Sequence, residues 1–197
     1  MEPFFFRIKR KFYCRPMPAK PPQPSDWHTH IQAPDGAPVR VLMVCMGNIC
    51  RSPTAHGVLE KLVADAGWAG RIAVDSAGTH GYHVGEPPDE RAQRHAARRG
   101  YDLSAQRARE LRRDDFAHFD LVLVMDAANE RAARALCPSD RTGRLRRLTD
   151  FCRTRSASEV PDPYYGGAQG FEEVLDLVED ACHGLLAALQ APGGGPA

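Results

Sequence analysis

A cysteine and an arginine stand in one short segment at a spacing that suits the binding and attack of a phosphate group. The segment reads Cys45-Met46-Gly47-Asn48-Ile49-Cys50-Arg51-Ser52-Pro53. A loop that enters a helix directs successive backbone N–H groups at one centre, and such a centre binds anions. Gly47 gives the loop backbone freedom, and Arg51 can hold two phosphate oxygens with its planar guanidinium, which lysine cannot do. The segment therefore predicts a phosphate-binding loop.

Cys45 begins this loop and would lie beneath the phosphorus atom of a bound phosphate. The positive surroundings that hold phosphate also favour the thiolate, which is the nucleophilic form of cysteine. Ser52 could donate a hydrogen bond to that thiolate, and Asn48 could brace the loop through its amide. The alternative is that Cys45 is only a small buried core residue at the end of a strand. The other residues of the segment disfavour this alternative. Cys50 is either a packed thiol or the partner of Cys45 in a reversible disulfide.

Segments of strand and helix character alternate along the chain and would position this loop. Short apolar runs predict strands, and apolar residues at helical spacing predict helices. The expected strands cover 39–44, 72–74, 121–125 and 145–148, and the expected helices cover 53–67, 87–100, 127–136 and 171–189. This alternation predicts an α/β fold with three layers, in which a parallel sheet is flanked by helices. In such folds the reaction site lies at the carboxyl ends of the strands, where the loop after the first strand would be.

The composition divides the chain at about residue 38. Half of the 16 prolines lie in residues 1–38, and proline removes a backbone donor and disfavours helix before it. We therefore expect a basic, proline-rich N-terminal arm over 1–38 that is extended or disordered. A single domain is expected over 39–190, and residues 191–197 are expected to form a flexible tail.

Charge and apolar content argue against several classes of protein. The 26 basic and 25 acidic residues give a net charge of +1, whereas a broad nucleic-acid-binding surface shows a strong basic excess. The chain has no apolar run of the length that crosses a bilayer, and the apolar run Phe4-Phe5-Phe6 is too short for a secretory signal. We therefore expect a cytoplasmic protein with mostly reduced thiols, and the cysteine spacings complete no zinc site.

Five motifs, in order along the chain, resemble those of the low-molecular-weight protein tyrosine phosphatases of the bacterial type. They are Val44–Pro53, Asp75–Thr79, Gly85–Asp89, Met125-Asp126 with Asn129, and Asp162–Gly166. The resemblance spans about residues 39–190. It implies a four-stranded parallel sheet, a phosphate loop after the first strand, and a hydrolase that needs neither a metal nor a cofactor. It also implies tyrosine-phosphorylated proteins as substrates, a bacterial tyrosine kinase being one such partner.

The resemblance further implies roles for individual residues. Cys45 would attack phosphorus and form a cysteinyl-phosphate intermediate, Arg51 would bind the phosphate oxygens, and Asp162 would act as general acid and then base. The rest of the phosphate-binding loop would be Met46, Gly47, Asn48, Ile49, Cys50 and Ser52. The side chains expected to wall a cleft around an aromatic ring are Tyr82, Tyr164 and Tyr165. Those expected to support the loop by hydrogen bonds are Ser76 and Gln106.

Two positions depart from the family pattern. Gln106 stands where the family often has histidine. Glutamine forms hydrogen bonds but carries no charge, so the hydrogen-bond network around the loop is expected to differ. His56 stands just behind the loop, where many relatives have glutamate. A histidine there could alter the charge near the thiolate, although histidines at such helix positions are more often solvated.

Three other interpretations compete with a tyrosine phosphatase. A thiol-dependent arsenate reductase needs two further closely spaced cysteines, but Cys137 and Cys152 stand far apart and Cys182 lies in the last expected helix. Related phosphoarginine phosphatases tend to have threonine where Ile49 stands. A non-catalytic phosphate-binding adaptor usually lacks the nucleophile or the acid, and this chain has both. The residues taken alone leave Asp162 as a turn-forming Asp-Pro, and only the resemblance brings it to the same cleft.

Overall fold

The computed structural model describes residues 37–191, and the predictions for the arm and the tail lie almost entirely outside this range. Four strands form one sheet: β1 (Val39–Cys45), β2 (Ile72–Gly78), β3 (Leu121–Val124) and β4 (Leu145–Arg147). The strands are parallel and their order across the sheet is β2-β1-β3-β4. Parallel strands need long crossover connections, which the helices supply. The predicted four-stranded parallel sheet is confirmed.

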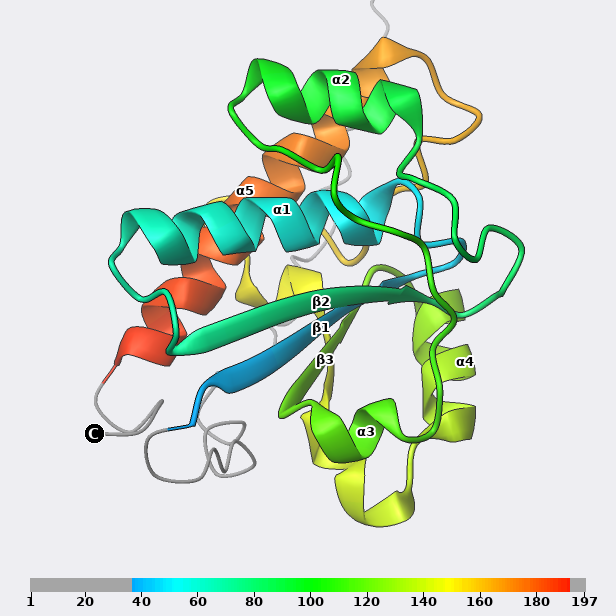
Figure 1. The fold of residues 1–197 in the computed structure, drawn as a ribbon, viewed down its shortest axis with the longest axis vertical. Coiled ribbons are helices and arrows are strands. Elements are labelled where there is room, and N and C mark those ends of the chain that lie inside the picture. The colour runs from blue at the N-terminus through cyan, green and yellow to red at the C-terminus, as the bar shows by residue number, and fades with distance from the viewer. Residues whose placement is uncertain (1–36, 192–197) are drawn as a thin grey trace, which may run out of the picture.

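Helices cover both faces of the sheet (Figure 1). The helices are α1 (Arg51–Asp65), α2 (Glu90–Arg98), α3 (Asp115–His118), α4 (Ala127–Leu136) and α5 (Ala168–Gln190), with 3₁₀ turns over Ser139–Arg144 and Leu148–Phe151. In Figure 1, α1, α2 and α5 lie on one side of the sheet, and α3 and α4 lie on the other. The three-layer prediction is therefore confirmed. Within residues 37–191, no helix combines the length and the apolar character that a membrane span requires.

The core is divided by the sheet, because alternate residues of a strand point to opposite faces. One face of β1 packs against α1 and α5 and contributes Val39, Val41, Met43 and Cys45. The other face packs against Phe116 of α3 and Ala133 of α4 and contributes Leu42 and Val44. β1 is thus buried on both sides, as its near-continuous apolar sequence predicts for a central parallel strand. Burial of this strand anchors the loop that follows it.

Several element boundaries differ from the predicted ones. β2 continues to Gly78 because Cys45 and Gly78 are paired in the parallel register with β1, although Asp75 and Ser76 interrupt its apolar pattern. α1 begins two residues before Pro53, and α5 begins at Ala168, three residues before its first buried apolar residue. The short α3 was not predicted, because four residues are too few for a helical period to be visible.

Candidate active site

The loop after β1 surrounds the sulfur of Cys45. This residue is the last of β1, and its side chain is buried. The backbone N–H of Asn48 donates to Cys45 Sγ at 3.3 Å, and Ser52 Oγ lies 3.1 Å from the same sulfur. Donors directed at sulfur stabilise a thiolate more than a thiol. The predicted nucleophile therefore lies in surroundings that suit an anion.

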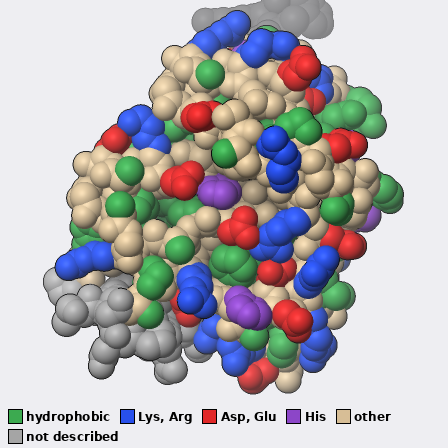
Figure 2. Space-filling model, in the orientation of Figure 1, with side chains coloured by type: hydrophobic (Ala, Val, Ile, Leu, Met, Phe, Trp, Pro, Cys, Tyr) green, Lys and Arg blue, Asp and Glu red, His purple; other side chains and the backbone are tan. Residues whose placement is uncertain are grey.

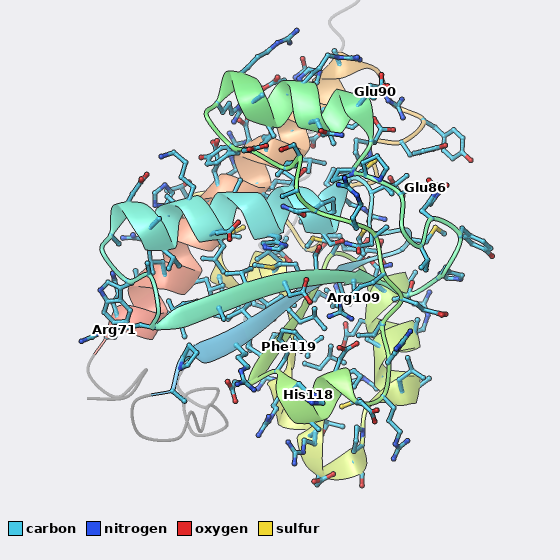
Figure 3. The ribbon with its side chains drawn as sticks, viewed as in Figure 1. Arg71, Glu86, Glu90, Arg109, His118 and Phe119 are labelled. Atoms are coloured by element: carbon cyan, nitrogen blue, oxygen red, sulfur yellow. The ribbon has the colours of Figure 1, made fainter. Side chains whose placement is uncertain are left out.

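Asn48 holds the loop in its curved conformation. Its backbone φ is 56°, in the left-handed region that asparagine adopts more readily than most residues. Its amide nitrogen donates to Ser52 Oγ and to Ser76 Oγ, each at 2.9 Å, and its amide oxygen accepts from the backbone N–H of Arg109 at 2.9 Å. Arg109 lies beside the carboxyl end of β2 (Figure 3). The side chain thus ties the loop to two neighbouring segments.

Arg51 is the first residue of α1, and its side chain is buried between two carboxylates. One guanidinium nitrogen lies 2.6 Å from Asp126 Oδ2, and the other lies 2.9 Å from Asp162 Oδ2. Burial alone would lower the pKa of Arg51, but Cys45 and these two carboxylates raise it above its ordinary value. The guanidinium therefore keeps its charge within the protein interior.

Asp126 also belongs to the site, although its sequence position alone assigned it no role. It caps the amino end of α4, where its Oδ1 accepts from the backbone N–H of Asn129 at 2.7 Å. Its other oxygen orients Arg51, as described above. Its position two residues after β3, the most apolar strand, was the available signal, because polar residues at carboxyl ends of parallel strands meet at one edge of the sheet.

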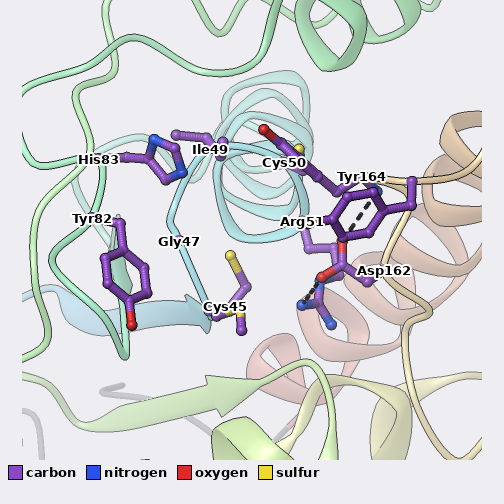
Figure 4. Close-up of a pocket in the computed structure, with 11 residues that line it drawn as sticks. Cys45, Gly47, Ile49, Cys50, Arg51, Tyr82, His83, Asp162 and Tyr164 are labelled. Atoms are coloured by element: carbon purple, nitrogen blue, oxygen red, sulfur yellow. Dashed lines mark hydrogen bonds and ion pairs between the residues drawn. The ribbon is translucent and has the colours of Figure 1, made fainter.

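The predicted nucleophile, arginine and acid line one cavity of about 410 Å³ at this edge (Figure 4). Met46, Gly47, Ile49 and Cys50 of the loop contribute to its lining, as do Tyr82, Tyr164 and Tyr165. Tyr165 is 97% exposed and lies at the rim, whereas Tyr164 is 39% exposed. His83, which was not predicted, also lines the cavity and lies 2.6 Å from Glu86 through its Nδ1. The cavity is of a size that suits an aromatic phosphate.

The two cysteines of the loop differ in environment. Burial raises the pKa of Cys50 far above its ordinary value, and the negative charge of Asp89 raises it further. Cys50 is therefore a neutral thiol at physiological pH, which is a poor nucleophile. Both cysteines are free. The alternative of a reversible disulfide between Cys45 and Cys50 stays a prediction.

Of the two departures from the family pattern, His56 lies on α1 and Gln106 packs against that helix. Gln106 donates through its amide nitrogen to the backbone carbonyl of Pro53 at 3.1 Å, so it supports the first turn of the helix that carries Arg51. The expectation that His56 is solvated is wrong, because its side chain is only 13% exposed. His56 Nδ1 and Gln106 Oε1 are both buried without a hydrogen-bond partner among residues 37–191.

The buried His56 should make folding stability depend on pH. Burial lowers its pKa, and the negative charges of Glu60 on α1 and Asp75 on β2 offset this only in part. The unfolded chain then binds a proton that the folded chain does not, so stability falls as pH drops below about 6.5 and levels off below the folded pKa. We expect His56→Gln to reduce this loss, measured as urea midpoints between neutral and acidic pH. His183→Gln on the exposed face of α5 is the control, and an unchanged pH dependence in His56→Gln would contradict the prediction.

Charged side chains of both signs are interspersed on the face drawn in Figure 2. This arrangement agrees with the near-zero net charge of the chain. The net charge of the chain therefore supplies little attraction for an anion, in line with the expectation that the loop and Arg51 supply it. Within the part of the chain that the structure describes, no group of three or more His, Cys, Asp or Glu side chains is arranged to hold a metal ion.

Comparisons with known proteins agree with this fold and site. The model of the low molecular weight phosphotyrosine protein phosphatase family matches residues 40–193. A low molecular weight protein-tyrosine-phosphatase of Streptomyces coelicolor is 46% identical over 154 residues, which are 77% of this chain and 93% of that protein. The protein YfkJ of Bacillus subtilis, with the same description, is 40% identical over 152 residues, which are 77% of this chain and 96% of that protein. The crystal structure of a protein tyrosine phosphatase from Entamoeba histolytica superposes with a TM-score of 0.75 at 39% identity, covering 77% of this chain and 97% of that one.

Fold and site together define an α/β enzyme built around a phosphate loop at the end of its first strand. The match over most of the chain gives the family: this chain belongs to the low molecular weight phosphotyrosine protein phosphatases. The family, the fold class and the phosphatase class predicted from the sequence are thus confirmed.

Proposed function

We propose that this chain hydrolyses phosphotyrosine in proteins through a cysteinyl-phosphate intermediate. The observation that carries the proposal is the convergence of Cys45, Arg51 and Asp162 on one cavity with tyrosines at its rim. The names of the relatives, which are protein-tyrosine-phosphatases, support the same class of substrate. We further propose that the site residues take the roles that the family resemblance implies.

In the first step, the phosphate group binds among the backbone N–H groups of the loop and the guanidinium of Arg51. The Cys45 thiolate attacks phosphorus, an S–P bond forms, and the bond from phosphorus to the phenolic oxygen breaks. Asp162 enters this step protonated and gives its proton to the departing oxygen. Arg51 and the loop donors stabilise the charge on the equatorial oxygens of the transition state.

In the second step, water enters the place that the tyrosine has left. Asp162, now a carboxylate, accepts a proton from this water, and the water oxygen attacks phosphorus. The S–P bond breaks, inorganic phosphate leaves, and Cys45 returns to the thiolate that Ser52 and the Asn48 N–H stabilise. The cycle consumes one water and needs no electron donor, so reduced thiols elsewhere in the chain take no part.

The positions of Cys137, Cys152 and Cys182, within the described residues, disfavour an arsenate reductase. Cys182 is fully buried on α5 with its sulfur near the carbonyl of Ala55, and Cys152 lies near the carbonyl of Leu177. Cys137 ends α4. These three cysteines are not among the residues that line the cavity, where a disulfide relay from Cys45 would need them. A non-catalytic adaptor is disfavoured because the nucleophile and the acid line the same cavity. A cytoplasmic location stays part of the proposal.

Hydrolysis by the purified full-length chain tests the proposed function. The substrates are phenyl phosphate and two matched peptides, one with phosphotyrosine and one with phosphoserine, in a buffer that contains EDTA. We expect turnover of both aromatic phosphates and little turnover of phosphoserine, which leaves the cavity walls without a ring to contact. Absence of aryl phosphate hydrolysis would overturn the proposal, and reduction of arsenate with release of arsenite would favour the alternative.

We also propose that residues 39–190 form the complete catalytic domain. Among residues 37–191, those that line the cavity lie between 45 and 165, and β1, which anchors the loop, begins at Val39. We expect a chain that begins at residue 37 to keep the kcat/KM of the full-length protein on phenyl phosphate. Both proteins are compared by steady-state kinetics and thermal unfolding. A large fall in kcat/KM with unchanged melting temperature would place part of the site in residues 1–36.

A further inference from the structure

Arg91 lies outside the cavity but is joined to the phosphate loop through Asp89. Asp89 donates its backbone N–H to the carbonyl of Ile49 at 2.8 Å. Its carboxylate caps α2 and accepts from the backbone N–H of Arg91 at 2.8 Å and from the guanidinium at 3.0 and 2.8 Å. These bonds lower the pKa of Asp89, so the pair is charged. The guanidinium of Arg91 is thus held at a set position beside the loop.

The same guanidinium also holds the segment that carries the acid. Its third nitrogen donates to the backbone carbonyl of Tyr164 at 3.0 Å, and the group lies over the rings of Tyr164 and Phe171, 5.3 and 5.0 Å from their centres. The backbone N–H of Tyr164 in turn donates to Asp162 Oδ1 at 3.2 Å. A continuous set of contacts therefore runs from the phosphate loop through Arg91 to the carboxyl group of Asp162.

Packing holds this acid segment at Pro163, which is buried, whereas the residues on either side of it are exposed. The side chain of Asp162 is 46% exposed and Tyr165 is 97% exposed, and two glycines, Gly166 and Gly167, follow. Before the segment, the Val160 N–H donates to the carbonyl of Met125. Exposed, glycine-rich segments open at low free-energy cost unless specific contacts restrain them.

The other charged contact of the acid changes during the proposed reaction. Asp162 is paired with Arg51 in this structure, but Arg51 must bind phosphate and Asp162 must be protonated when the phenolic oxygen leaves. Their ion pair is therefore lost at the step that needs the acid in place. Arg91 does not line the cavity, so phosphate does not compete for it. Its contact with Tyr164 persists through that step.

We propose that Arg91 is a positioning residue that fastens the Asp162 segment to the phosphate loop and so sets the acid against the leaving oxygen. The inference rests on the proposed function. Its effect should be confined to proton transfer, because the nucleophile and phosphate donors are held by other contacts. The loss in kcat/KM on replacing Arg91 should therefore be larger for a leaving group that needs a proton than for one that does not.

The test compares kcat/KM for phenyl phosphate, whose phenolate needs a proton, with 2,4-dinitrophenyl phosphate, whose leaving group departs without one. We expect Arg91→Ala to lower kcat/KM about tenfold or more for phenyl phosphate, which is part of the effect that a placed general acid contributes. For the dinitrophenyl ester, kcat/KM should change little. Arg91→Lys, which keeps the charge but lacks the fork, should show the same selective loss in weaker form. Arg94→Ala, on the same helix and paired with Glu90 at 3.6 Å, is the matched control and should match the wild type.

A double-mutant cycle with Asp162→Ala tests whether Arg91 acts through the acid. Once Asp162 is absent, Arg91→Ala should cost nothing further on phenyl phosphate. The inference would be overturned if the loss in kcat/KM of the double variant equalled the product of the two single losses. It would also be overturned if Arg91→Ala lost equally on the two esters, and either result would indicate a general structural role. Inhibition by inorganic phosphate should stay unchanged in Arg91→Ala, since a large change would mean that the loop itself had moved. If the wild type hydrolyses neither ester, the proposed function fails; if it hydrolyses both and only the selectivity is missing, the inference about Arg91 fails alone.

Discussion

Replacing Cys45 by serine is expected to lower turnover of aryl phosphates on the order of 10⁶-fold, the scale on which a covalent nucleophile contributes. The loop presents the Asn48 N–H at 3.3 Å and Ser52 Oγ at 3.1 Å to the sulfur. These donors suit a thiolate, but a serine hydroxyl keeps its proton at neutral pH, because no described side chain at this sulfur is a base. The variant should therefore bind phosphate without attacking it.

Steady-state kinetics and phosphate binding by calorimetry, with a thermal unfolding curve for each protein, measure this effect. Cys137→Ser and Cys152→Ser are the controls, because both cysteines lie away from the cavity lining and should leave turnover unchanged. Activity in Cys45→Ser close to that of the wild type would rule out the covalent mechanism. Loss of turnover in either control would mean that the loss in Cys45→Ser is not specific to the nucleophile.

Replacing Asp162 by alanine is expected to lower kcat/KM for phenyl phosphate by about 10²–10⁴-fold, the usual contribution of a placed general acid. The loss should be much smaller for 2,4-dinitrophenyl phosphate, which needs no proton on its leaving oxygen. Phosphate affinity should persist, because Arg51 keeps its contact with Asp126 at 2.6 Å and gains a free nitrogen. With the dinitrophenyl ester, quenching during turnover should trap more phosphate on Cys45, since the first step proceeds without the acid whereas the second step loses its base.

Glu159→Ala provides the matched control for Asp162→Ala. Glu159 lies three residues earlier on the same segment, and its carboxylate accepts from the N–H of Ala127 at 3.0 Å rather than lining the cavity. The control should keep wild-type kcat/KM on both esters. Equal loss on the two esters in Asp162→Ala, or no loss at all, would remove Asp162 from the role of general acid.

The phosphate loop could be predicted from the sequence because its parts are contiguous. Cys45, Gly47 and Arg51 lie within seven residues, between an apolar strand and a helix start. Local backbone geometry alone brings such residues to one centre, since a loop that enters a helix converges its N–H groups. The alternation of strand and helix was likewise visible, because burial on one or both faces imposes a period on the sequence.

No local pattern in the sequence specifies which distant residues reach the loop; the family resemblance indicated Asp162, and only the tertiary structure shows the contacts. Asp126 and Asp162 reach Arg51 from 75 and 111 positions away, and Arg91 reaches Tyr164 from 73 positions away. The burial of His56 and the contact of Gln106 with Pro53 also arise between separate elements. Hydrophobic periodicity specifies which face of an element is buried but not which element covers it. The order β2-β1-β3-β4 brings these segments to one edge of the sheet, and that order follows from packing of the whole chain rather than from any local pattern.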